Sequence, residues 1–351
     1  MYYSAGDFIK APKCDAHIHY NMVDDTVMKY AVSVNMRILT INTDLSEPTI
    51  DKQLKIALTL KEKYPGWFDF LGTFDASKFE STTFSTQTIA HLKKTIDEGA
   101  VGIKIWKNIG MDLRDTNGQY IMADHHAFAP IYKYLEKNRI PLLTHLGEPR
   151  NCWLPYHEIT TKGDLRYYKK HRKYHMYQHP EVPTYEQQIA ARDHILEHYP
   201  QLQIVGAHLG SMEWDLCEVE KRFELFPNFC IDLSGRMEHI QLQASQNPKK
   251  VRDFFIKYQD RIMYGSDWDV TGRNKRTWLR LFHKCFPRIY KKMLFTLFFQ
   301  TWRTHWIFLA TDTVAKNTSI AGLHLPKSVI NKIFHGNAVR IYHLPEPIKR
   351  C

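Results

Sequence analysis

The sequence lacks the patterns that identify several common classes of protein. Its six cysteines form no C-x-x-C pair, which excludes a thiolate zinc site or dithiol redox motif of the usual spacing. No G-x-G-x-x-G or P-loop motif is present, so no phosphate-binding glycine loop is expected. Low-complexity segments and internal repeats are also missing. Scattered cysteines in a chain of 351 residues favour a reducing, cytoplasmic location.

Long hydrophobic runs are missing as well. The longest apolar stretch, residues 293–310, contains Gln300, Arg303 and His305, which makes it too polar for a membrane span. We predict a buried or subunit-contact helix there, with a membrane-surface helix as the alternative. The first 13 residues lack the basic and then apolar pattern of a signal peptide. We therefore expect no membrane association.

Acidic residues are outnumbered. The chain has 37 Asp and Glu against 48 Lys and Arg, a formal net charge of +11. Much of this charge lies in residues 162–172 and 273–292, where aromatic residues are interleaved as in some nucleic-acid grooves. No nucleic-acid-binding motif accompanies these segments. They are expected to be solvated faces that attract small anions, and we expect no nucleic-acid partner.

The pattern that recurs is a short apolar run followed by a longer helical stretch. Eight runs are predicted to be strands: residues 14–19, 36–42, 68–74, 101–106, 140–145, 203–208, 229–233 and 262–266. Near-continuous apolar runs of this kind are typical of parallel strands with helices on both faces of the sheet. Helices are predicted between them, at residues 51–64, 86–98, 126–138, 186–199, 213–226 and 248–258.

Eight strands that alternate with helices favour an α/β fold of the (β/α)₈ TIM-barrel type over an open doubly wound sheet. We predict a single domain over residues 1–351. The connection after the fifth strand, residues 147–184, is unusually long. It is predicted to be a lid or pocket wall, or alternatively a folded subdomain used for dimer contact. Residues 271–351 are predicted to be a C-terminal helical extension, and we expect a homo-oligomer, such as a dimer.

Histidine, in contrast, is abundant. In a TIM barrel the chemistry takes place at the C-terminal ends of the strands. His17 and His19 end the first predicted strand, His145 the fifth and His208 the sixth, and Asp267 follows the eighth. With 19 histidines in 351 residues, one H-x-H match is expected by chance. Residues i and i+2 of a strand share a face, however, so His17 and His19 can hold the same ion.

Each of these residues also has an ordinary structural explanation. A lone histidine at a strand end is often a surface or hydrogen-bonded core residue. His145 and His208 share an apolar strand before them and a glycine two residues after them, which favours a common role. Asp267 could instead cap the next segment. Asp15, two residues before His17, is expected to support the ligands from behind.

This combination of an H-x-H on strand one, histidines on strands five and six and an aspartate on strand eight resembles the amidohydrolase superfamily. More narrowly, it is similar to the amidohydrolase-related (amidohydrolase 2) branch that includes aminocarboxymuconate-semialdehyde decarboxylase-like proteins. Residues 328–344 (SVINKIFHGNAVRIYHL) also resemble the closing helix of that branch. The resemblance implies that a divalent metal, which we expect to be one Zn²⁺, is held by four residues, with His208 as acid and base beside it. The implied metal ligands are His17, His19, His145 and Asp267.

The number of metals depends on Lys104. In binuclear members of the superfamily, a carboxylated lysine from strand four bridges two metals. Lys104 lies inside the fourth predicted strand and not at its tip. We therefore favour one ion, with Lys104 as an electrostatic partner; Mn²⁺ or a second ion remain alternatives. The candidate substrate-binding residues are Lys104, Trp106, Lys107, Arg150, Trp153 and Tyr156.

The resulting functional hypothesis is a metal-dependent hydrolase. It would cleave an amide, lactone or ester bond in a small substrate, anionic or hydroxylated, with His208 or Asp267 moving the proton of water to the leaving group. The alternative is a metal-dependent decarboxylase on the same scaffold. A third reading is a catalytically silent barrel that only binds a ligand, since one fold supports many functions.

Overall fold

The structure is a computed structural model that describes residues 1–270, 287–314 and 320–347. Contacts divide the chain into two compact units. The first unit comprises Met1–Ile41, Asp51–Phe70 and Ala244–Cys351, and the second comprises Asn42–Ile50 and Leu71–Gln243. The two units are described separately below.

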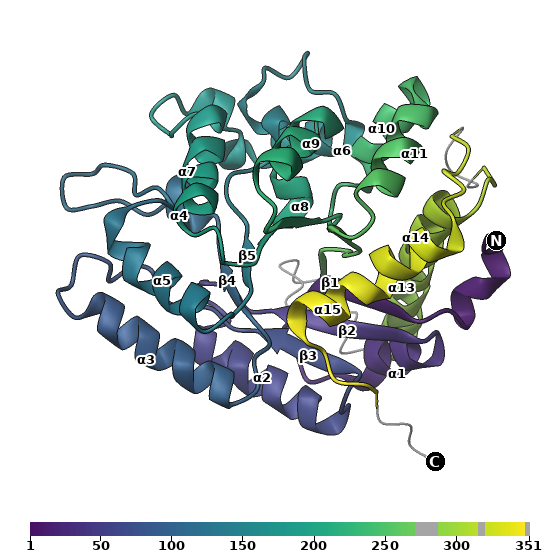
Figure 1. Cartoon of the computed structure of the whole chain (residues 1–351), viewed down its shortest axis with the longest axis horizontal. Coiled ribbons are helices and arrows are strands. Elements are labelled where there is room, and N and C mark those ends of the chain that lie inside the picture. Colours follow the sequence, from purple (N-terminus) through teal and green to yellow (C-terminus); the bar gives the residue numbers. More distant parts are fainter. Residues whose placement is uncertain (271–286, 315–319, 348–351) are drawn as a thin grey trace. The chain divides into compact units, whose positions relative to one another are not determined.

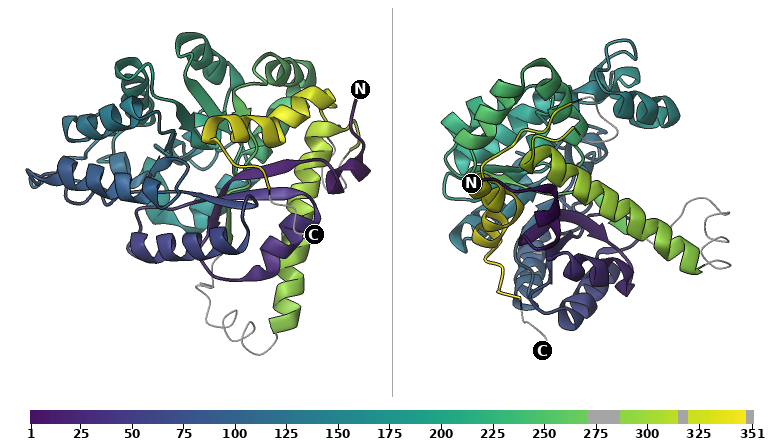
Figure 2. Two further views of the ribbon diagram at one scale, coloured as in Figure 1. Left: turned by 60° about the horizontal axis from the view of Figure 1, so that its bottom comes forward. Right: turned by 90° about the vertical axis from the view of Figure 1, so that its right-hand side faces the viewer.

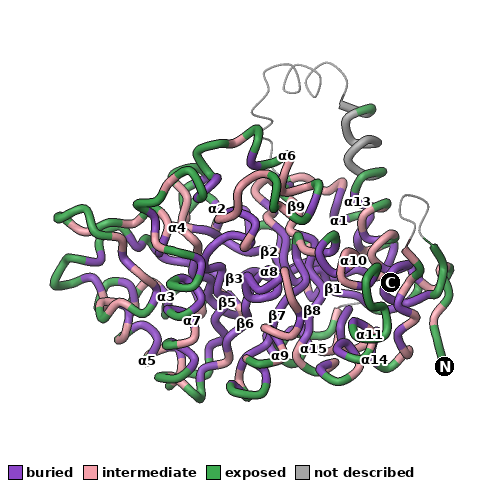
Figure 3. The backbone as a smooth tube through the Cα atoms, turned by 90° about the horizontal axis from the view of Figure 1, so that it is seen from above, coloured by how far each residue is buried: buried purple, intermediate pink, exposed green. Residues whose placement is uncertain are grey.

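The first unit is built on a sheet with the strand order β3-β2-β1-β9. Its strands are β1 (Lys13–Tyr20), β2 (Met36–Ile41), β3 (Phe68–Leu71) and β9 (Trp268–Val270). β1 pairs in parallel with β2 and with β9, and β1, β2 and β3 lie side by side in Figure 1. Figure 3 shows β1 and β2 almost entirely in the colour of buried residues. This burial explains why their sequences read as apolar runs.

Helices connect and cover these strands. The helices and short strand of this unit are η1 (Ala5–Ile9), α1 (Asp25–Ser33), α2 (Ile50–Lys63), α11 (Pro248–Lys257), β8 (Ile262–Met263), α13 (Pro287–Ala310), α14 (Lys327–Asn331), the π-helical turn η6 (Lys332–Gly336) and α15 (Asn337–Tyr342). α1 begins where the Asp24 side chain accepts a hydrogen bond from the Thr26 N–H, which satisfies one of the free donors of the first turn.

α13 contains the long apolar stretch of the sequence. It contacts α1 and η1, and Figure 2 shows it as one long helix beside the N-terminal segment. Trp302 and Trp306 are fully buried; Trp302 stacks on Tyr30 with the ring centroids 5.7 Å apart. The prediction of a buried helix at residues 293–310 is therefore confirmed for its C-terminal half. No helix among the described residues is long and apolar enough to cross a membrane.

The second unit contains four parallel strands that are neighbours in chain order. They are β4 (Ile103–Ile105), β5 (Leu142–Thr144), β6 (Ile204–Gly206) and β7 (Phe229–Asp232). The main helices of the unit are α3 (Phe84–Asp97), α5 (Ala129–Lys137), α7 (Tyr185–His198), α9 (Leu216–Leu225) and α10 (Met237–Gln246), with the short α4 (Asn108–Met111), η2 (His126–Phe128) and α8 (Ala207–Gly210). Each strand is followed by at least one helix, the order that parallel neighbours require.

The long segment after β5 folds on itself. It holds η3 (Arg150–Trp153), α6 (Lys162–Lys170), η4 (Arg172–Tyr174) and η5 (Met176–Gln178). A small apolar cluster within it consists of Cys152, Tyr168, Met176 and Val182. α6 begins where the Thr161 hydroxyl accepts a hydrogen bond from the Asp164 N–H. The segment is therefore ordered, while its roles as a lid or as a dimer contact stay predictions.

All eight predicted strands are present, and the predicted α/β fold class with (β/α)₈ alternation is confirmed. The strands are mostly shorter than predicted, and the eighth is only Ile262–Met263. β9, α1 and α10 were not predicted. The described parts of the 271–351 extension are mainly helical, and residues 271–286, 315–319 and 348–351, with most of the basic segment 273–292, lie outside the described residues. The single-domain organisation stays a prediction.

Candidate active site

Within the first unit, two histidines surround one carboxylate. The Nε2 atoms of His17 and His19 lie 3.5 and 3.6 Å from Oδ1 of Asp267. The His17 side chain is fully buried, whereas those of His19 and Asp267 are 19% and 34% exposed. Two imidazoles and a carboxylate are a ligand set that zinc and similar divalent cations accept. The open side of Asp267 leaves this set accessible from solvent.

The local backbone explains how these side chains meet. The pairing of β1 with β2 shifts between Asp15 and Ile18, so the strand carries one extra residue there, as in a β-bulge. The Asp267 N–H donates to the His17 carbonyl over 2.8 Å. Asp267 itself has a φ of 62°, a left-handed conformation that is uncommon for residues other than glycine and is often found at functional sites.

Asp15 lies behind this group. It accepts hydrogen bonds from the Ser266 N–H over 2.9 Å and from the Trp302 indole over 2.8 Å. The His17 N–H also donates to it, over 3.4 Å. Burial raises the pKa of Asp15 to about 6, although these hydrogen bonds oppose the shift. Asp15 thus fixes the backbone beside His17 and Asp267; the support of the imidazole rings themselves stays a prediction.

Within the second unit, His145 and His208 are in contact. Nε2 of His208 lies 3.3 Å from Nδ1 of His145, and both residues are buried. Nδ1 of His208 donates to the Ser234 carbonyl over 2.8 Å. The Ser234 hydroxyl bonds Asp232, and Asp232 also accepts from the His208 N–H over 2.9 Å. This chain of contacts fixes the orientation of the His208 ring.

The hydrogen bonds also assign the tautomers. Because a carbonyl oxygen can only accept, Nδ1 of His208 carries the proton and Nε2 carries the lone pair. Nδ1 of His145 is then the donor in the contact between the two rings, which places the His145 lone pair on Nε2. That is the protonation state in which a histidine can bind a metal. The donor chemistry of His145 therefore fits the predicted role.

The turn that carries His208 is strained. His208, Leu209 and Ser211 all have φ values between 58° and 60°, so the short α8 contains left-handed residues. The Ser211 hydroxyl holds the turn against the segment that follows β5 by donating to the Leu146 carbonyl over 2.8 Å. Strained backbone of this kind persists only where the surroundings fix it, and it concentrates at functional sites.

The predicted substrate-binding residues near β4 have different environments. Lys104 lies in the middle of β4 and is fully buried. Lys107 forms an ion pair with Glu148, so its charge is compensated within the protein. Trp106 is half-buried, with the Lys107 ammonium 6.0 Å from its ring centroid.

The predicted residues of the long segment are mostly occupied in packing. The Arg150 guanidinium lies 4.3 Å from the Trp214 ring centroid. The Trp153 indole donates to the Pro183 carbonyl over 3.3 Å, and Tyr156 stacks on His175 with the centroids 4.5 Å apart. Trp153 and Tyr156 pack against the apolar cluster of this segment, and their substrate role stays a prediction.

Sequence reasoning did not single out several polar residues that the structure places beside these groups. They are Glu148, Glu213, Asp232, Ser234 and Arg236. A signal was available for some of them, because Asp232 lies near the end of the seventh predicted strand, Ser234 directly follows that strand, and Glu148 follows the fifth. Glu213 carried no such signal, since it lies beyond the turn of α8.

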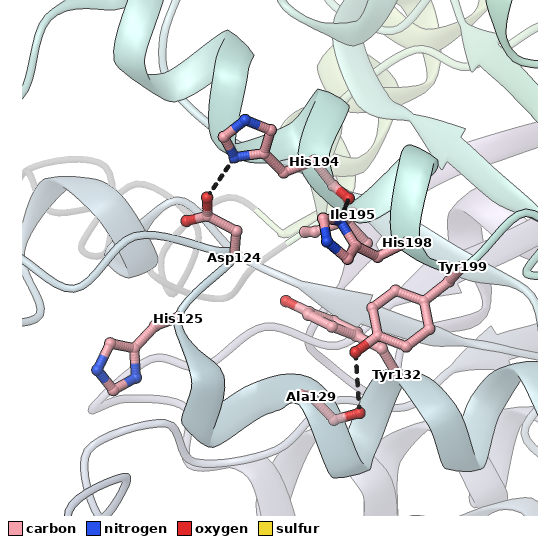
Figure 4. A pocket seen from close by; sticks show the side chains of 8 residues that line it. All are labelled: Asp124, His125, Ala129, Tyr132, His194, Ile195, His198 and Tyr199. Atoms are coloured by element: carbon pink, nitrogen blue, oxygen red, sulfur yellow. Dashed lines mark hydrogen bonds and ion pairs between the residues drawn. The ribbon is translucent and has the colours of Figure 1, made fainter.

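A separate pocket of about 190 Å³ lies between α5 and α7 and contains three histidines. Figure 4 shows Nδ1 of His194 pointing to Asp124; the two atoms are 2.7 Å apart. This hydrogen bond raises the pKa of His194. Nδ1 of His198 is engaged with the His194 carbonyl over 2.8 Å. None of the predicted ligands lines this pocket, so it is not the candidate site.

Comparison with known proteins identifies the family. Residues 81–344, more than half of the chain, match the sequence model of the amidohydrolase family. No curated protein matches the sequence at a significant level. Among solved structures, the chain is similar to 2,6-dihydroxybenzoate decarboxylase from Rhizobium (15% identity, 95% of this chain and 99% of the other, TM-score 0.48). It is also similar to an amidohydrolase from Burkholderia multivorans (12% identity, 95% of this chain and 100% of the other, TM-score 0.49). A third similar structure is dihydroorotase from Campylobacter jejuni (15% identity, 97% of this chain and 85% of the other, TM-score 0.49). By the extent of the family match, the chain belongs to the amidohydrolase family.

Proposed function

We propose that this protein is a metal-dependent hydrolase that cleaves an amide, lactone or ester bond in a small substrate. His17, His19, His145 and Asp267 would hold one divalent cation, which we expect to be Zn²⁺. The observation that carries the proposal is the approach of two imidazole Nε2 atoms to within 3.6 Å of a single Asp267 oxygen. The family match supports it, because amidohydrolases usually bind a divalent metal.

The residues of each unit suit their proposed tasks. When bound, a divalent cation polarises a carbonyl group and lowers the pKa of water. His208 can accept a proton at Nε2, because its Nδ1 proton is held by Ser234, and it can return that proton to the leaving group. Asp267, one-third exposed, is the second candidate base. Ser234 and Asp232 hold the His208 ring in one orientation.

Metal content tests the proposal. The variant His17→Ala should lose both the bound divalent ion, measured by plasma mass spectrometry on the purified protein, and hydrolytic turnover. The matched control is His157→Ala, because the His157 side chain is 80% exposed in the long segment. An unchanged metal content in His17→Ala would exclude the assigned ligand set.

Substrate panels separate hydrolysis from decarboxylation. Lactones, amides and carboxylated aromatic compounds would be offered to the metal-loaded enzyme while acid release and CO₂ release are recorded. We expect acid release from a lactone, ester or amide. Release of CO₂ without hydrolysis would overturn the hydrolase assignment in favour of the decarboxylase.

Lys104 provides the test of metal number. Because it is buried in the middle of β4, we propose that it acts electrostatically and bridges no second ion. The variant Lys104→Met should retain one ion per chain. Two ions per wild-type chain, both lost in the variant, would show that Lys104 is a bridging ligand.

A further inference from the structure

The second unit contains another pocket, which the proposed function does not use. Its volume is about 370 Å³, and it lies between α7 and α9, with η3 and the segment after α8 completing its wall. Pockets of about 300–1,000 Å³ are the usual size of small-molecule sites. Neither His145 nor His208 lines this pocket, so a ligand bound there is separate from the proposed proton-transfer group.

One part of the wall is apolar and is held by hydrogen bonds. It is formed by Tyr185, Ile189, Met212 and Trp214. The Trp214 indole donates to the Tyr185 hydroxyl over 2.9 Å, and that hydroxyl donates to the Ser211 carbonyl over 2.6 Å. A wall that is already ordered costs little conformational entropy when a ligand binds. This part of the pocket therefore suits an apolar side chain of a ligand.

Most of the charges that line the pocket are compensated within the protein. Nε of Arg222 lies 3.1 Å from Oδ2 of Asp193, and Nη1 of Arg222 contacts Glu218. Asp193 also pairs with Arg192 over 2.6 Å, and Glu218 pairs with Lys221 over 2.6 Å. Burial lowers the pKa of Arg222, but the two carboxylates raise it above its usual value. This network needs no charge from a ligand.

Arg150 lines the same pocket and lies outside this network. Its guanidinium carbon is 4.3 Å from the Trp214 ring centroid, and it forms no ion pair with any described residue. The neighbouring Glu213 carboxylate accepts from the backbone N–H of Arg150 and not from its guanidinium. A guanidinium that rests on an aromatic ring keeps its N–H groups for other partners, and two of them match the two oxygens of a carboxylate. Arg150 is thus equipped to bind a carboxylate.

Glu186 supplies the opposite charge. It lies in the first turn of α7, lines the pocket and is exposed. It has no ion-pair partner in the part of the chain that the structure describes, Arg150 included. An ammonium group, with three donors and a positive charge, is its complement. The pocket therefore offers one guanidinium and one carboxylate that the protein itself leaves unpaired.

We propose that this pocket binds a small zwitterion, an amino acid with an apolar side chain. Its carboxylate pairs with Arg150, its ammonium group pairs with Glu186, and its side chain lies against Ile189 and Met212. A purely anionic ligand would add a second negative charge beside Glu186, and a purely cationic one would add a second positive charge beside Arg150. A zwitterion complements both residues and adds no net charge. The assignment goes beyond the proposed function and does not depend on the metal.

Three probes of one carbon skeleton test the assignment. They are L-leucine, 4-methylpentanoate, which lacks the ammonium group, and 3-methylbutylamine, which lacks the carboxylate. Each is titrated into the full-length wild-type protein by ligand-observed NMR. Leucine should bind about tenfold more tightly than either analogue, because each analogue loses one charged hydrogen-bonding group.

Two variants remove one charge each. Glu186→Gln should bind leucine about tenfold more weakly without weakening 4-methylpentanoate. Arg150→Met should weaken leucine by a similar factor without weakening 3-methylbutylamine. The matched controls are Glu197→Gln, at an exposed residue of α7 outside the pocket, and Arg166→Met, at an exposed residue of the long segment. Both controls should bind all three probes as the wild type does.

The ranking in the wild type keeps the test decisive even where a variant fails to fold. Equal or tighter binding of either analogue, or no binding of leucine, would overturn the assignment, as would an unchanged ranking in the folded variants. Chelator-treated wild type separates this site from the proposed metal centre, because it should keep the preference for leucine. Loss of that preference together with the metal would place leucine at the metal and overturn the assignment. Failure of the metal assignment would leave the leucine ranking as an independent result.

Discussion

At the residue scale, burial decides which groups of this protein carry charge. His305 of α13 is an example outside the candidate site. Its Nδ1 lies 2.9 Å from the hydroxyl of Tyr264, which is fully buried and stacks on Phe334 with the centroids 4.5 Å apart. Burial lowers the pKa of His305 to about 4. The folded protein therefore keeps this histidine neutral at pH values where an exposed histidine is protonated.

This difference predicts a pH-dependent stability. Because the unfolded chain takes up the His305 proton near pH 6.5 and the folded chain only near pH 4, the unfolded state binds more protons between these values. The free energy of unfolding should therefore decrease as the pH falls from about 6.5 to about 4, by on the order of 3 kcal/mol from this residue. Urea denaturation at a series of pH values measures it.

The comparison for this prediction is His305→Gln, which keeps a polar side chain and cannot be protonated. Its stability curve should be flatter over the same pH range. Parallel curves for the two proteins would show that His305 is not the group responsible.

At the scale of the element, the end of α13 depends on one close contact. The Leu323 N–H donates to the Phe308 carbonyl over 2.7 Å and the Leu325 N–H to the Leu309 carbonyl over 3.0 Å. These bonds satisfy carbonyls of the last helical turn, which otherwise have no partner within a helix. Gly322 permits this approach, because a Cβ atom there would lie 1.9 Å from the Thr311 carbonyl oxygen.

We therefore predict that Gly322→Ala destabilises the protein by about 1–3 kcal/mol, since backbone and not a flexible side chain would have to move. Gly6→Ala is the matched control in the same unit, because the nearest atom to its Cβ lies 3.7 Å away. Its effect should stay within about 0.5 kcal/mol. Chemical denaturation of the three proteins measures the difference, and equal stability of both variants would contradict the proposed contact.

At the scale of the whole molecule, metal binding and stability should be linked. A ligand that binds only the folded chain stabilises it in proportion to the logarithm of its concentration. After chelator treatment, added Zn²⁺ at about a hundredfold excess over its dissociation constant should stabilise the protein by about 2.7 kcal/mol. Thermal unfolding of the wild type and of Asp267→Ala measures this, because the variant should respond weakly. An identical response of the two proteins would place the stabilising ion elsewhere.

The sequence by itself determined the order of strands and helices and the identity of the candidate ligands. Eight apolar runs that alternate with helical stretches are a local pattern, and every one of them became a strand. The positions of His17, His145, His208 and Asp267 near strand ends followed from the same pattern. The long segment after β5 was recognisable in the sequence from its length alone. Its internal apolar cluster was not recognisable there.

Only the tertiary structure decided the contacts between residues far apart in the chain. The bulge in β1 depends on its pairing with β2, and the tautomer of His208 depends on Ser234, 26 residues away. Asp267 meets His17, far from it in the chain, because β9 pairs with β1. The ion pair of Asp193 in α7 with Arg222 in α9 depends on the packing of these helices, which no local pattern encodes. Local propensity fixes the elements, whereas the partners of buried polar groups depend on packing across the whole fold.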